Sequence, residues 1–181
     1  AAVMLPRPLA RFLSGRDNLR INVRELPHQA LAEALTSQSI DLALTTLARP
    51  LPHSTESVSL FRLEYSVVCP PAHPLARLKQ VRLRDLLPYR VSLYQDPAVF
   101  VDRLTQLGAE AGTLPRIVFH SDQALTVFEM ASAGLGVAVL PTLFRQRALR
   151  RHLAMRPLAE RNLGYPVVAA AHGQRAIDLL K

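Results

Sequence analysis

The sequence predicts an α/β protein made of two lobes. Its 181 residues suit one compact domain or two small lobes that share a linker. Hydrophobic residues make up 49% of the chain and charged residues 20%, which indicates a folded core rather than disorder. Strand-like and helix-like patterns alternate in two successive halves, and this order is typical of parallel sheets with helical crossovers.

The first half shows helical and alternating periodicity in turn. Apolar residues at helical spacing predict a helix at 7–13 and a second helix at 28–38. Pro6 and Pro8 lie near the start of the first helix, where proline is tolerated. Alternation of apolar and polar residues predicts a half-buried strand at 19–24. Further strands are predicted at 40–44 and 60–69.

The second half repeats the pattern after two short helical pieces. These pieces are predicted at 73–76 and 83–87. Strands are predicted at 90–94, 115–120 and 136–140, with helices at 97–111 and 122–133 and a short helix opened by Pro141. The tail holds possible strands at 153–158 and 165–171, and a helix from Gln174.

This order places residues 1–70 with 157–181 in lobe I and residues 71–156 in lobe II. We expect a ligand cleft between the lobes, because ligands of open α/β sheets bind beyond the carboxyl ends of the strands. Those ends are Thr45-Thr46, Tyr94-Gln95-Asp96 and His120-Ser121-Asp122. Ser121 and Asp122 could cap a helix alone or cap it and also contact a ligand; Gln95-Asp96 before Pro97 and the two threonines carry the same ambiguity.

The residue patterns do not predict catalysis, a cofactor or a metal. Cys69 is the only cysteine, and the six histidines show neither i,i+4 pairing nor another metal-ligand spacing. The G-x-G of Gly134 and Gly136 follows a predicted helix and precedes a strand, which is the reverse of a dinucleotide fingerprint, so we interpret it as a helix C-cap. No apolar run is long enough to cross a membrane.

The formal net charge of +8 comes almost entirely from arginine. It invites a nucleic-acid interpretation, but the excess is spread along the chain and lacks interleaved aromatic residues or a helix-turn-helix. A solvated face or a partner contact therefore explains the densest basic run better than phosphate contacts do. That run consists of Arg145, Arg147, Arg150, Arg151 and Arg156.

Several segments together resemble the effector-binding domain of LysR-type transcriptional regulators. Order and spacing agree over nearly the whole chain, and Ser39 replaces a glycine that is usual in the family. The matching stretches are 39–44, 64–70 leading into 73–76, 81–86, and 131–141 with the sequence ASAGLGVAVLP.

The resemblance implies two Rossmann-like lobes similar to type 2 periplasmic binding proteins, with a small-molecule effector in the cleft. A carboxylate-bearing effector is favoured by the arginine excess. The family also implies a winged helix-turn-helix, expected upstream of Ala1, through which alone the protein would bind DNA. The effector contacts implied for this chain are Thr45, Thr46, Tyr94, Gln95, Asp96, His120 and Ser121.

The resemblance further implies a cytoplasmic homodimer or homotetramer. Helix 7–13 and strand 19–26 of one copy would face helix 97–111 and strand 115–120 of the other, which is an isologous contact. A solute-binding protein that serves a transporter shares the fold and is the alternative. A small α/β enzyme is disfavoured because no nucleophile–base or metal constellation is present.

Overall fold

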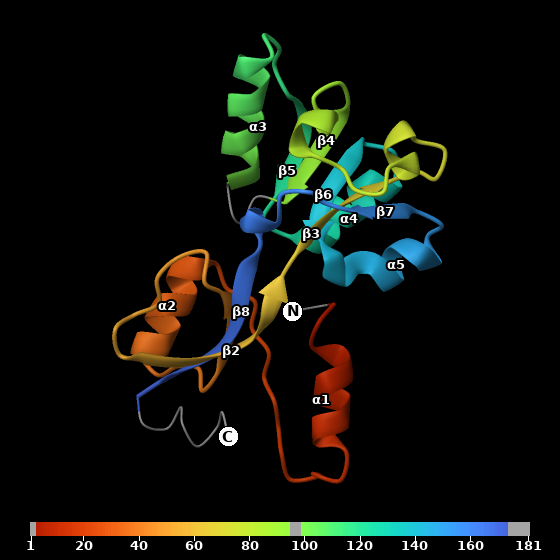
Figure 1. Cartoon of the computed structure of the whole chain (residues 1–181). Helices are drawn as coiled ribbons and strands as arrows, with labels where there is room; N and C mark the ends of the chain where they lie inside the picture. Colours follow the sequence, from red (N-terminus) through yellow and green to blue (C-terminus); the bar gives the residue numbers. More distant parts are fainter. Residues whose placement is uncertain (1–2, 95–98, 174–181) are drawn as a thin grey trace. The chain divides into compact units, whose positions relative to one another are not determined.

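The computed structural model describes residues 3–94 and 99–173 (Figure 1). The chain divides into two compact units. Unit 1 comprises Ala1–Leu63 with Tyr165–Lys181, and unit 2 comprises Glu64–Gly164.

The described part of unit 1 contains a three-stranded antiparallel sheet in the order β1-β8-β2. Helix α2 packs on β8 (Figure 1), and the small core gathers around Leu35 and Val168, both shielded from solvent. Helix α1 has no buried residue. The elements are α1 (Pro6–Leu13), α2 (His28–Thr36), β1 (Ala43–Thr46), β2 (Thr55–Leu63) and β8 (Tyr165–His172).

Unit 2 contains a five-stranded mixed sheet in the order β5-β4-β6-β3-β7. Strand β4 pairs in parallel with β5 and β6, whereas β3 pairs antiparallel with β6 and β7. Helix α4 packs against β3, β4, β5 and β6, so it covers the middle of the sheet. The elements are β3 (Tyr65–Cys69), β4 (Arg90–Tyr94), α3 (Val99–Glu110), β5 (Arg116–Ser121), α4 (Ala124–Ser132), β6 (Val137–Pro141), α5 (Arg145–Arg150) and β7 (Ala154–Pro157), with 3₁₀ turns η1 (Pro74–Arg77), η2 (Leu83–Leu86), η3 (Thr142–Phe144) and η4 (Arg161–Leu163).

The division between the units differs from the predicted lobes at both crossings. The predicted boundaries followed residues 70 and 156, whereas the units part after Leu63 and Gly164. Strand β3 belongs to unit 2 because both of its partners, β6 and β7, lie there. Leu158 joins the same unit through a bridge to Val81.

Three details of the predicted elements are wrong. The single strand predicted at 60–69 is two strands, β2 and β3, which pair with different sheets on either side of Glu64. The segment 19–24 pairs with no described strand, and its apolar residues Leu19, Ile21 and Val23 are exposed. The expected parallel pairing holds for β4 with its neighbours but not for the described sheet of unit 1.

The interpretation of the G-x-G as a helix C-cap is confirmed. The amide of Gly134 donates to Ala131 O at 3.0 Å, and the amide of Leu135 donates to Met130 O at 3.0 Å. Gly134 has a φ of +90°, so the two bonds and the left-handed residue form a Schellman motif that ends α4.

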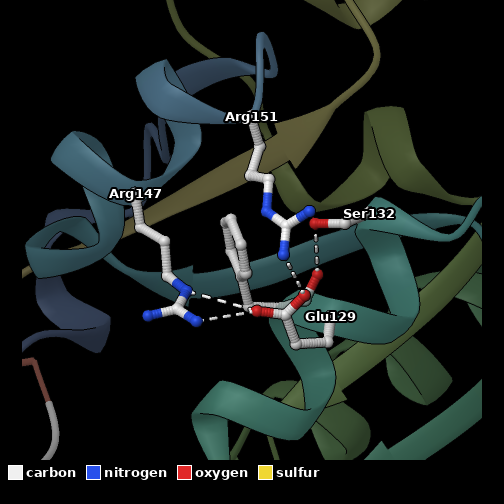
Figure 2. A network of polar contacts seen from close by, with 5 residues as sticks. Glu129, Ser132, Arg147 and Arg151 are labelled. Atoms are coloured by element: carbon white, nitrogen blue, oxygen red, sulfur yellow. Dashed lines mark hydrogen bonds and ion pairs between the residues drawn. The ribbon is translucent and has the colours of Figure 1, made fainter.

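Part of the basic run 145–156 is used inside unit 2. The Glu129 carboxylate on α4 accepts from Arg147 Nη2 at 2.9 Å and from Arg151 Nη2 at 3.3 Å (Figure 2). Arg156 Nε donates to Ala76 O at 2.8 Å. Glu129 and its partners are about half exposed, so the pairs contribute little free energy in water, but they tie α4 to the α5 region.

Candidate functional site

The carboxyl ends of β4 and β5 carry three predicted site residues in unit 2. The two strands run parallel, and their last residues, Tyr94 and Ser121, are register partners. His120, the residue before Ser121, pairs with Leu93. Because residues paired across neighbouring strands share a face of the sheet and successive residues alternate, Tyr94 and Ser121 lie on one face and His120 lies on the other.

The connection from β5 to α4 differs from the prediction in its capping. The helix begins at Ala124 with Gln123 as N-cap, so neither Ser121 nor Asp122 is the cap residue. Instead Ser121 Oγ accepts from the Gln123 amide at 3.0 Å, which makes a serine turn before the helix. The bond orients the Ser121 side chain and leaves its hydroxyl hydrogen available as a donor.

The two predicted threonines lie in unit 1 and end strand β1. Thr45 pairs with Val168 and Thr46 with Val167 on β8, and both threonines are half-buried. Their position at the carboxyl end of β1 is therefore as predicted. Gln95 and Asp96 lie outside the described residues.

The described residues contain no group of three or more His, Cys, Asp or Glu side chains that could hold a metal ion. Cys69 is buried in β3, and burial raises the pKa of its thiol, although Arg156 opposes that shift. A buried, protonated thiol is a poor nucleophile. Within the two described ranges, no helix is long and apolar enough to cross a bilayer.

Sequence reasoning missed a pocket at the other end of β4 and β5. The pocket measures about 330 Å³ and is lined by residues that include Arg90 and Arg116, the first residues of the two strands. The sequence places both arginines at the start of predicted strands. It does not show that the two strands pair with these residues side by side.

The two α/β units define the class of the protein, which has the type 2 periplasmic binding protein-like fold. The chain belongs to the family of LysR substrate binding domains, whose model matches residues 1–180. This confirms the resemblance that the sequence motifs carried.

Individual relatives agree with this family. The chain is 28% identical over 143 residues to the HTH-type transcriptional regulator CysB of Haemophilus influenzae, a match that covers 79% of this chain and 44% of the relative. It is 27% identical over 144 residues to the transcriptional dual regulator GltC of Bacillus subtilis, covering 78% and 47%. The chain thus spans about half the length of the curated relatives it matches.

A solved structure shares the fold as well. The crystal structure of HinK, a LysR family transcriptional regulator from Pseudomonas aeruginosa, is similar with a TM-score of 0.70 and 28% identity. The similarity covers 95% of this chain and 60% of HinK.

Proposed function

We propose that this chain is the ligand-sensing domain of a bacterial LysR-type transcription regulator and that it binds a small-molecule effector without catalysing a reaction. The observation that carries the proposal is the family match over residues 1–180 together with the polar carboxyl ends of β4 and β5. Relatives that are named as transcription regulators favour this function over transport of a solute. The proposed location is the cytoplasm, where the regulated DNA lies.

The proposed effector contacts are the seven predicted positions. Thr45, Thr46, Tyr94, His120 and Ser121 supply hydroxyl groups and an imidazole, which suit a polar or carboxylate-bearing metabolite. Gln95 and Asp96 complete the proposed set. DNA binding is assigned to a helix-turn-helix outside these 181 residues, and the effector would act by favouring one arrangement of the regulator over another.

A thermal-shift screen followed by calorimetry tests this function. A metabolite that binds the native state should raise the unfolding temperature, with organic acids screened first. We expect Thr45→Ala to weaken the binding of that metabolite about fivefold, as loss of one hydrogen bond costs about 1 kcal/mol. Thr36→Ala, at an exposed position of α2 in the same unit, is the matched control and should bind like the native chain. Equal affinities for all three proteins would remove Thr45 from the site.

We also propose a homodimer or homotetramer that uses the predicted isologous contact. In unit 1, α1 buries none of its residues, and Phe12 is 49% exposed. In unit 2, Leu114 before β5 and Val118 within it are exposed too. Apolar side chains gathered on both predicted contact regions are typical of a protein interface.

Light scattering after size exclusion should therefore give at least twice the mass of one chain. Phe12→Ser should shift the population toward the monomer because it removes an aromatic side chain from the contact. Leu149→Ser, at an exposed position of α5 outside the predicted contact, should leave the distribution between monomer and oligomer unchanged. A native chain that is monomeric at micromolar concentration would contradict the proposal.

A further inference from the structure

A pocket lies within unit 2, at the amino ends of its parallel strands. It measures about 330 Å³, which is at the small end of the range for small-molecule sites. Arg90 and Arg116 line it as the first residues of β4 and β5, whereas the candidate effector contacts Tyr94 and Ser121 are the last residues of the same strands. The pocket is therefore separate from the proposed effector contacts.

Two arginines line this pocket. Arg90 and Arg116 are register partners across the parallel β4–β5 pair, and both are exposed. Like charges directly opposite one another on a sheet are destabilising. Among the described residues, neither guanidinium has a carboxylate or another side-chain partner. An anion that bridges the two guanidinium groups would remove this repulsion and accept several charge-assisted hydrogen bonds.

The remaining walls of the pocket are largely apolar. The rings of His73 and Tyr89 meet edge to face, with centroids 4.5 Å apart, and Val137 adds an aliphatic side chain. His73 Nδ1 accepts from the Leu75 amide at 3.2 Å, and burial lowers the pKa of the His73 imidazole. Burial thus favours the neutral imidazole, and the two arginines supply the positive charge of the pocket.

The Gly134–Gly136 turn closes one side of the pocket with backbone. A Cβ added at Gly136 would overlap the carbonyl oxygen of Arg90, so this turn approaches the start of β4 as only a glycine allows. The pocket is thus shaped by rigid elements, namely two strand starts and a tight turn.

We propose that this pocket binds a small organic acid. Its carboxylate would lie between Arg90 and Arg116, and its apolar body would pack against Tyr89, His73 and Val137. A carboxylate fits the planar guanidinium groups, and the apolar walls favour an acid with a ring or a branched chain over a simple inorganic anion. The regulator would then carry two separate ligand sites, one at each end of β4 and β5.

Residue-resolved NMR on the ¹⁵N-labelled 181-residue chain tests the site with benzoate and acetate. Benzoate should shift the amide signals of His73, Tyr89, Arg90 and Arg116 in a saturable way. Acetate carries the same charge without the ring, so its affinity at these amides should be at least tenfold weaker. Absence of benzoate shifts there, or equal affinities for the two acids, would overturn the proposal.

Charge-removal variants show whether the arginine pair is responsible. The double variant R90Q/R116Q should lose at least tenfold in benzoate affinity at these amides. R84Q/R150Q removes two exposed arginines elsewhere in unit 2 and should bind as the native chain does. If the double variant does not fold, R116Q alone, on the strand at the end of the sheet, gives the same readout. Native-like binding by the folded variant would overturn the proposal, and Thr45→Ala, which tests the effector proposal, should leave this binding unchanged.

Discussion

Replacing Gly136 by alanine is expected to destabilise unit 2 by about 4 kcal/mol, from roughly 1–3 kcal/mol of backbone strain and a similar cost of steric overlap. Gly136 has a φ of +122°, which L residues rarely adopt. An added Cβ would also overlap Arg90 O and lie 2.8 Å from Arg90 C, and these atoms belong to the backbone of β4. Neither atom can move without disturbing the central parallel strands. Hydrogen exchange of β4 and β6 peptides, followed by mass spectrometry, measures the loss within unit 2.

Gly134→Ala is the matched control for this prediction. Gly134 lies in the same turn with a φ of +90°, but an added Cβ would find nothing within 4 Å. Gly134→Ala should therefore lower the free energy of unfolding by backbone strain alone, about 1–2 kcal/mol. Equal destabilisation by the two substitutions would show that the contact with Arg90 is not responsible.

The elements of unit 2 could be predicted largely from local patterns. The strand predicted at 90–94 coincides with β4, and the helix and turn around Gly134 have the expected form. Periodicity of apolar residues and the chemistry of glycine decide these features within a few neighbouring residues. Such features need no knowledge of the partner strands.

Features that depend on distant partners could not be predicted in this way. The apolar run around Glu64 has the pattern of one strand, but β2 pairs with β8 and β3 pairs with β6 and β7, all far along the sequence. The segment 19–24 has a strand-like pattern, yet no described strand pairs with it. A pattern shows that a segment can form a strand, whereas the sheet depends on which edges meet.

The same distinction applies to the sites. The carboxyl ends of β4 and β5 could be located from strand boundaries alone, and the register then placed Tyr94 beside Ser121. The pair formed by Arg90 and Arg116 can be recognised only once the register of β4 and β5 is known. A single arginine at a strand start indicates no particular function. The structure also explains part of the arginine excess, because Arg147 and Arg151 form ion pairs with Glu129 within the same unit.

The second large effect is expected at Phe128 on α4. Its side chain is fully buried, and its ring stacks on Phe144 with centroids 5.5 Å apart. Phe128→Ala should lower the free energy of unfolding of unit 2 by about 3–5 kcal/mol, because a large buried side chain is lost and a cavity is left. Urea denaturation monitored by circular dichroism, combined with hydrogen exchange of α4 peptides, measures the change.

The position of Phe128 links this loss to the candidate site. Helix α4 follows the Ser121 turn directly and packs across β3, β4, β5 and β6, so a loosened helix would also free the Gln123 amide that Ser121 Oγ accepts from. Phe128→Leu should cost only about 1–1.5 kcal/mol since most of the volume is kept. Leu149→Ala, at a position of α5 that is 59% exposed, should change the free energy of unfolding by less than about 0.5 kcal/mol. A Phe128→Ala protein as stable as the Leu149→Ala protein would mean that α4 is not anchored through this ring.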